Sequence, residues 1–279
     1  MSVVTFWNNG KEHTGKTLAI AAMATYMGIE HNNRILVIST SLNDDTLKNC
    51  FWGDEEEKSK KNLGLFGPNT NMAMQNGIEG LDRIVRSNKV TTDIITDYTK
   101  IVFKDRLEIL LGLKGNEEGY KQLRETYLTI IDLASQYYDL VLVDLDNEVG
   151  ESLKNDILNK SDLVVATLSQ RLKCLNDFNA DREENPLLKS IKTLILIGRY
   201  DKFSKYTVKN ITRYLGEKNQ VSTLPYCTQL FEAAEEAGVP DMFLRLRKVD
   251  KDDRNSFFIN EVKRLADNIQ YRLKDIQMR

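Results

Sequence analysis

Four residues near the start of the sequence have the types and the spacing of a phosphate-binding loop. Gly10, Gly15, Lys16 and Thr17 match the pattern G-x-x-x-x-G-K-[ST]. In such a loop the backbone N–H groups point at phosphate, and the following helix adds the positive end of its dipole. We expect Lys16 to reach the β- and γ-phosphates of a nucleotide and the Thr17 hydroxyl to hold Mg²⁺. The residues predicted to line this site are Gly10, Lys11, Glu12, His13, Thr14, Gly15, Lys16, Thr17 and Leu18.

The segments around this loop predict a strand, a helix and a second strand. Residues 3–7 are apolar, residues 16–30 are rich in alanine, and residues 34–38 are apolar and β-branched. This order is a βαβ unit, which indicates a parallel sheet. The polar residues 39–45 then follow the second strand, at the edge on which open α/β sheets bind ligands.

A later strand, predicted at 138–144, ends in Asp144. Its four consecutive apolar residues indicate a strand that is buried on both faces, and an acid at this end is suited to a magnesium-linked role. We favour that role for Asp144; the alternative is a residue that only ends the strand. Residues 145–150 would form a switch segment with Gly150 as its hinge.

The alternation of strands and helices predicts one doubly wound α/β domain over residues 1–279. Right-handed crossovers between successive strands give a mostly parallel sheet with helices on both faces, a three-layer α/β/α arrangement. The remaining elements are predicted as strands at 162–167, 192–198 and 221–225 and helices at 151–159, 171–181, 204–216, 231–237 and 255–277.

Residues 46–125 are predicted to form an elaborated crossover within this domain. The predicted segments are a solvated loop at 55–61, a turn at 63–69, helices at 77–89 and 91–100 with Thr91 capping the second, strands at 101–103 and 107–111, and a helix at 117–137.

The composition gives the protein an overall charge that does not attract nucleic acid. The net charge is −2 and the isoelectric point is about 5.9. The three cysteines are far apart and show no metal-binding spacing, which is typical of reduced thiols in the cytoplasm. No apolar run approaches the roughly 18 residues of a membrane-spanning helix. We therefore predict a cytoplasmic protein.

The loop resembles that of the ParA/MinD ATPases, whose Walker A pattern carries an extra lysine near its start. Lys11 matches that lysine, and Leu224–Tyr226 and Phe231–Pro240 are similar to the family's base-binding loop and the segment after it. The resemblance implies that ATP and Mg²⁺ are the cofactors and that ATP drives homodimerisation. It also implies that Lys11 reaches the partner's ATP, so that Lys11 and Lys16 are the catalytic lysines, and that Pro225 and Tyr226 hold the base.

Three departures from the family pattern point to weak or absent hydrolysis. Glu12 and His13 replace two glycines, although histidine tolerates positive φ better than most residues. Residues 39–41 are hydroxyl residues where the family carries aspartates, so the group that orients the attacking water is missing. Gly198, followed by Arg199, replaces an asparagine that contacts adenine. This pattern resembles the TadZ/CpaE-like proteins of pilus assembly.

The predicted function is an ATP-dependent dimeric switch that positions a larger assembly through a protein partner. The alternative is an active partition-type ATPase that cycles on DNA or membrane. Lys11 could also be an ordinary solvated lysine of a monomer, and the cations between Arg199 and Arg213 could bind DNA, although a solvated helix surface is favoured. The apolar face of the helix at 255–277 could lie on the inner face of the cell membrane, but docking on the sheet is favoured.

Overall fold

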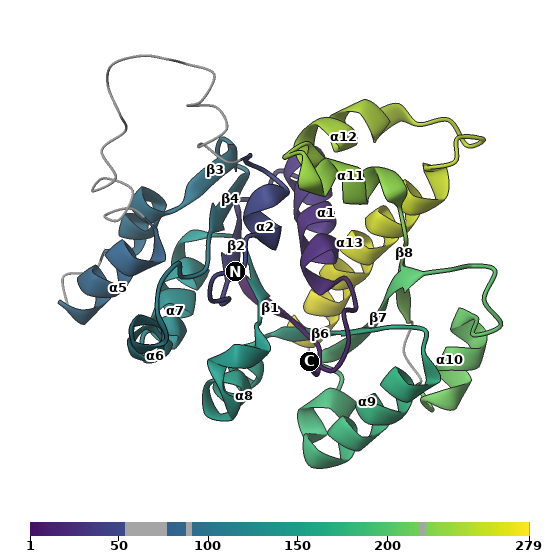
Figure 1. Cartoon of the computed structure of the whole chain (residues 1–279), viewed down its shortest axis with the longest axis horizontal. Coiled ribbons are helices and arrows are strands. Elements are labelled where there is room, and N and C mark those ends of the chain that lie inside the picture. Colours follow the sequence, from purple (N-terminus) through teal and green to yellow (C-terminus); the bar gives the residue numbers. More distant parts are fainter. Residues whose placement is uncertain (54–76, 88–90, 218–220, 279) are drawn as a thin grey trace.

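A computed structural model describes residues 1–53, 77–87, 91–217 and 221–278. The predictions of a solvated loop at 55–61 and a turn at 63–69 lie outside these residues. Figure 1 shows helices packed on both sides of a central sheet, as the sequence predicts.

The sheet has eight strands in the order β3-β4-β2-β5-β1-β6-β7-β8, and all neighbours are parallel except β3 and β4. β1 and β5 lie at its centre and every residue of both is buried, which explains their apolar runs. The register places Asp144 beside Phe6 on one side and Ser39 on the other. The strands are β1 Ser2–Trp7, β2 Ile35–Ser39, β3 Lys100–Phe103, β4 Leu107–Leu110, β5 Leu140–Asp144, β6 Leu163–Leu168, β7 Thr193–Tyr200 and β8 Ser222–Pro225.

The two faces of the sheet carry separate hydrophobic cores. One core is closed by α1, α2, α11, α12 and α13, and the other by helices between α5 and α10. The α-helices are α1 Lys16–Glu30, α2 Thr46–Asn49, α5 Ile78–Arg86, α6 Glu117–Arg124, α7 Tyr127–Tyr137, α8 Glu151–Lys160, α9 Leu172–Glu184, α10 Val208–Tyr214, α11 Thr228–Glu235, α12 Val239–Arg245 and α13 Ser256–Gln277. Short 3₁₀ helices are η1 Thr92–Tyr98, η2 Asn147–Val149, η3 Pro186–Lys189 and η4 Leu246–Lys248.

Several predicted helices differ in the structure. The predicted helix at 117–137 is two helices, because the buried Thr126 hydroxyl donates to Asp82 Oδ1 (2.6 Å) and to the Leu123 carbonyl (3.0 Å) at the break. Residues 92–98 form a 3₁₀ helix rather than an α-helix, and the Thr91 side chain does not cap it. α10 begins at Val208 rather than at residue 204. Gln170 Nε2 donates to the carbonyls of Asp201 and Tyr206, and these bonds keep the preceding residues in a loop.

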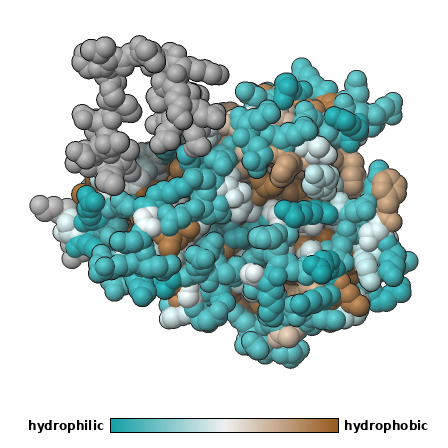
Figure 2. All heavy atoms as spheres, in the orientation of Figure 1, coloured by the Kyte–Doolittle hydropathy of each residue, from teal (hydrophilic) through white to brown (hydrophobic). Residues whose placement is uncertain are grey.

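The carboxyl-terminal helix docks on the domain. Its predicted apolar face is buried against α1 and β8, and Phe258, Val262, Leu265 and Ile269 are at most 3% exposed. This face is therefore packed inside the structure, as the favoured prediction of docking has it, and peripheral membrane contact through this helix stays a prediction. Within the described ranges, no helix is both long enough and apolar enough to cross a bilayer. The face in Figure 2 is mainly hydrophilic, with hydrophobic residues in small groups.

Candidate functional site

The phosphate-binding loop connects β1 to α1 at the carboxyl edge of the sheet. Gly10 and Gly15 have φ of 73° and 79°, so both glycines of the motif occupy left-handed backbone that other residues rarely adopt. Lys16 is the first residue of α1. The loop lines a cavity of about 710 Å³, to which Thr17, Asp146 and Arg199 also contribute.

Lys16, which lines this cavity, forms a buried ion pair with Asp144. Lys16 Nζ lies 2.6 Å from Asp144 Oδ1, and the two side chains are 10% and 6% exposed. Lys16 Nζ also donates to the Leu145 carbonyl. The fold thus brings together the loop lysine and the predicted magnesium-linked acid, which are 128 positions apart in the chain.

Asp144 and Thr17 carry the oxygen groups that would hold a magnesium ion shared with phosphate. Asp144 offers a carboxylate and Thr17 a hydroxyl, the hard ligands that Mg²⁺ prefers. The described residues contain no group of three or more His, Cys, Asp or Glu side chains that could hold a metal by themselves. A bound Mg²⁺ would therefore depend on nucleotide phosphates for part of its coordination, and it would neutralise their charge.

An asparagine pair that the sequence analysis missed fixes the shape of the loop. Asn8 Nδ2 donates to Thr14 Oγ1 (3.1 Å), and Asn147 Nδ2 donates to Asn8 Oδ1 (2.9 Å). The Asn147 side chain lies against Gly10, where a Cβ atom would come within 2.9 Å of it. The predicted switch segment is therefore tied to the loop, and Gly150 at its end has φ of 87°.

Glu12 turns away from the phosphate position. Its carboxylate accepts from Ser169 Oγ (2.7 Å) and pairs with Arg171 Nη1 (3.1 Å) in the loop before α9. The unfavourable placement of a carboxylate beside polyphosphate is thus avoided. Neither Glu12 nor His13 has positive φ, so the tolerance of histidine for left-handed backbone is not needed at this position.

Lys11 reaches outward from the loop toward α9. Its side chain is 53% exposed, and Nζ lies 3.9 Å from Asp177 Oδ1. The neighbouring Asn9 Nδ2 donates to Asp181 Oδ2 (3.0 Å), and burial raises the pKa of Asp181. The exposure of Lys11 leaves it accessible to a second molecule.

The far end of the cavity lies between β7 and the residues that follow β8. A Cβ atom at Gly198 would lie 2.1 Å from the Thr14 carbonyl oxygen, so the loop backbone fills the space of a side chain at 198. Arg199, with φ of 50°, lies over Gly15 and also lines a second pocket of about 40 Å³, together with Pro225 and Tyr226. The structure thus brings the predicted base-binding residues to the phosphate loop.

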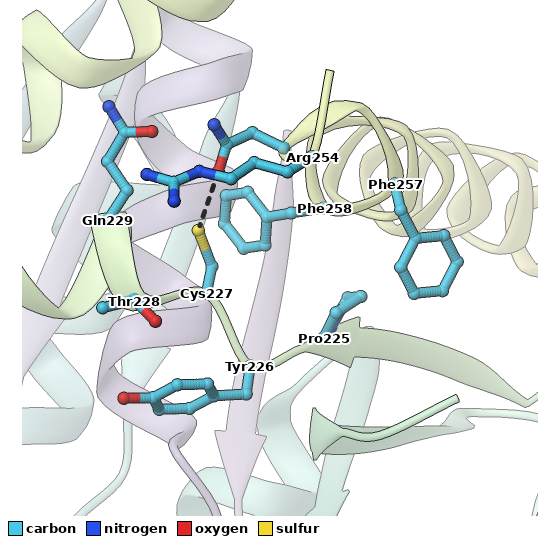
Figure 3. A pocket seen from close by; sticks show the side chains of 9 residues that line it. Pro225, Tyr226, Cys227, Thr228, Gln229, Arg254, Phe257 and Phe258 are labelled. Atoms are coloured by element: carbon cyan, nitrogen blue, oxygen red, sulfur yellow. Dashed lines mark hydrogen bonds between the residues drawn. The ribbon is translucent and has the colours of Figure 1, made fainter. Parts of the chain in front are cut away.

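A smaller hollow of about 180 Å³ continues beyond the base-binding residues (Figure 3). It lies between Pro225–Gln229 and the start of α13, with Arg254 and Phe258 on its far side. Cys227 Sγ donates to Asn255 Oδ1 at 3.8 Å, and burial raises the pKa of this thiol. The hollow shares Pro225, Tyr226 and Cys227 with the pocket beside Arg199, and it contains none of the phosphate-loop residues.

Solved structures match this architecture, whereas no family model and no curated protein matches the sequence. A ParA family ATPase from Chlorobium tepidum TLS gives a TM-score of 0.68 at 16% identity, over 92% of this chain and 96% of that one. The septum site-determining protein MinD from Pyrococcus horikoshii OT3, complexed with Mg-ADP, gives 0.65 at 14% identity over 96% and 95%. A MinC:MinD cell division protein complex from Aquifex aeolicus gives 0.62 at 14% identity over 97% and 96%. The chain has the ParA/MinD fold.

This ParA/MinD fold confirms the predicted fold class, a mostly parallel sheet with helices on both faces. Within it, the phosphate loop and Asp144 meet at the carboxyl edge of the sheet, as the sequence predicts. The resemblance to the TadZ/CpaE-like proteins stays a prediction.

Proposed function

We propose that this protein is an ATP- and Mg²⁺-dependent dimeric switch that positions a larger assembly, with slow or absent hydrolysis. The observation that carries the proposal is a correctly folded phosphate loop lining a 710 Å³ cavity in a ParA/MinD fold. A cavity of this size falls in the range of small-molecule and cofactor sites. The solved structures with this fold are named as a ParA family ATPase, a septum site-determining protein and a cell division protein complex, and the second of them contains Mg-ADP.

Three sets of residues each bind a different part of the magnesium–nucleotide complex. Backbone N–H groups from Gly10 to Leu18 bind the phosphates, with Lys16 exchanging Asp144 for the β- and γ-phosphates. Thr17 and Asp144 hold Mg²⁺. Arg199, Pro225 and Tyr226 hold the base end.

Lys11 is the residue that couples nucleotide binding to dimerisation in this proposal. It is exposed at the start of the loop, and its 3.9 Å approach to Asp177 is a surface contact of small energetic value. It can therefore leave that contact to reach the phosphates bound by a second copy. The partner that the dimer then recruits is a protein of the assembly, such as a pilus or secretion apparatus.

The test is the Lys11→Ala variant, with Lys173→Ala on the exposed surface of α9 as the matched control. Light scattering with and without MgATP should show an ATP-dependent dimer for the wild type and the control but not for Lys11→Ala. A fluorescent ATP analogue should still bind Lys11→Ala. An unchanged dimer fraction in Lys11→Ala would contradict the role of this lysine, and turnover unaffected by Lys16→Ala would contradict the nucleotide site itself.

A further inference from the structure

A groove of about 350 Å³ lies between α9 and α10, which are neighbours in the fold (Figure 1). Leu175 and Ile211 line it and are each 1% exposed, so they lie at its bottom. Leu172 and Tyr214 line it too, but they are 42% and 46% exposed. Contiguous apolar surface that is open to solvent and bordered by polar residues is typical of interaction sites.

Hydrogen bonds between the two walls hold the groove in shape. Gln170, just before α9, donates to the Tyr206 carbonyl (2.9 Å) and accepts from the Asp201 N–H (2.7 Å). The Tyr214 hydroxyl, at the end of α10, donates to Asn176 Oδ1 on α9. The loop before α10 and the end of α10 are therefore both tied to α9. A groove formed in advance lowers the cost of ordering side chains when a partner binds.

The chain on the α10 side of the groove carries an excess of positive charge. Residues 200–214 contain four cations and one acid, Asp201. The cations are Lys202, Lys205, Lys209 and Arg213, and none of them forms an ion pair with another described residue. Lys205 lines the groove itself. An acidic partner would complement this charge.

The acids of α9 that lie near the phosphate loop are on another face of this helix. Asp177 Oδ1 lies 3.9 Å from Lys11 Nζ, and Asp181 Oδ2 accepts from Asn9 Nδ2 (3.0 Å). At 3.6 residues per turn, positions 177 and 181 point away from positions 172 and 175, which line the groove. α9 therefore contacts the phosphate loop on one face and forms the groove with another.

We propose that this groove is the docking site of an acidic, amphipathic segment of a protein partner. The apolar side chains of the segment fill the groove between Leu172 and Tyr214, and its carboxylates pair with Lys205 and the neighbouring cations. DNA would use the cations but not the apolar groove, because phosphate contacts dominate its affinity. This inference rests on the proposed function for the recruitment of a protein partner, and it adds the chemistry of that partner.

The test is fluorescence anisotropy with a labelled helical peptide that has leucine and phenylalanine on one face and glutamate on the other. A second peptide carries lysine in place of every glutamate. The wild type should bind the glutamate peptide at least about tenfold more tightly than the lysine peptide, and added salt should weaken this binding. Leu172→Ser and Lys205→Glu should each weaken it at least about fivefold, because they remove an apolar anchor and a complementary charge.

The matched controls are Leu244→Ser and Lys121→Glu. Leu244 is 49% exposed on α12 and Lys121 is exposed on α6, so both substitutions should leave peptide binding unchanged. Equal affinity for the two peptides, or an affinity that neither groove substitution lowers, would overturn the proposal.

Two other occupants would also overturn the proposal. Binding of duplex DNA that Lys205→Glu abolishes and Leu172→Ser leaves intact would assign the cations to nucleic acid. A dimer that forms without nucleotide and is lost in Leu172→Ser would assign the groove to a second copy of the chain.

A fluorescent ATP analogue, titrated into the same samples, separates this inference from the proposed function. Normal binding of the analogue without binding of the glutamate peptide overturns this inference alone. Normal binding of the peptide without binding of the analogue overturns the proposed function alone.

Discussion

Lys16 Nζ and Asp144 Oδ1 lie 2.6 Å apart with neither side chain more than 10% exposed. The lysine that we propose to contact phosphate is thus neutralised by the acid that would help to hold Mg²⁺. Nucleotide and metal must therefore arrive together if both charges are to keep partners, because an unpaired buried charge is costly.

Removing Lys16 should destabilise the nucleotide-free protein. Lys16→Ala leaves Asp144 as an uncompensated buried charge, and we expect the free energy of unfolding in urea to fall by about 3–5 kcal/mol. The double variant Lys16→Ala/Asp144→Ala should recover much of this loss. A single variant as stable as the wild type would show that the pair is not formed in solution.

The sequence predicts those elements that are specified by residues close together in the chain. The fully buried, mostly apolar β1 and β5, the loop glycines and the place of Asp144 at the end of β5 all follow from local pattern, and the structure confirms their placement. The contacts that shape the site join distant residues, such as Asn8 with Asn147 and Glu12 with Ser169, which are 139 and 157 positions apart. Because no local pattern records which distant residue becomes a partner, Asn8, Asn147 and Arg171 were not predicted.

The ParA/MinD pattern that this sequence resembles carries an asparagine where this chain has Gly198. We expect that Gly198→Asn alone would not be tolerated. In Gly198→Asn the new Cβ would meet the Thr14 carbonyl at 2.1 Å, so the phosphate loop must shift. We expect a loss of about 1–3 kcal/mol in stability and nucleotide affinity at least about tenfold weaker by fluorescence titration.

Gly53 offers the matched control for this substitution. No atom of the described residues lies within 4 Å of a Cβ atom built at Gly53, so Gly53→Asn should change neither quantity. Normal affinity in Gly198→Asn would show that the loop can move without loss of the phosphate contacts.

The raised pKa of Asp181 predicts a pH dependence of stability. Burial disfavours its charged form in the folded protein, so the folded state holds this proton to higher pH than the unfolded state does. Asp181 therefore contributes stability at low pH that is lost as pH rises through the raised pKa. Urea denaturation of the wild type and Asp181→Asn across the acidic range should show the wild type losing stability relative to the variant as pH rises. A constant difference would contradict the shift.

Docking of α13 predicts that its apolar face contributes to stability. Leu265 is fully buried, and Leu265→Ala should lower the free energy of unfolding by about 2–5 kcal/mol. Tyr271, on the same helix, is 70% exposed, so Tyr271→Ala should change stability by no more than about 0.5 kcal/mol. Equal, small effects in the two variants would mean that the helix leaves the domain in solution.

The position of β1 has a consequence for how the protein is made. This strand lies far before its sheet partners β5 and β6 in the sequence, and the helix that follows it packs against α13. Contacts between such distant parts of a chain form slowly, since the intervening loop must first be closed. The phosphate loop connects β1 to α1, so we expect it to acquire its binding shape only late in translation. A nascent chain that stops before α13 holds the whole loop sequence but lacks the packing that fixes it.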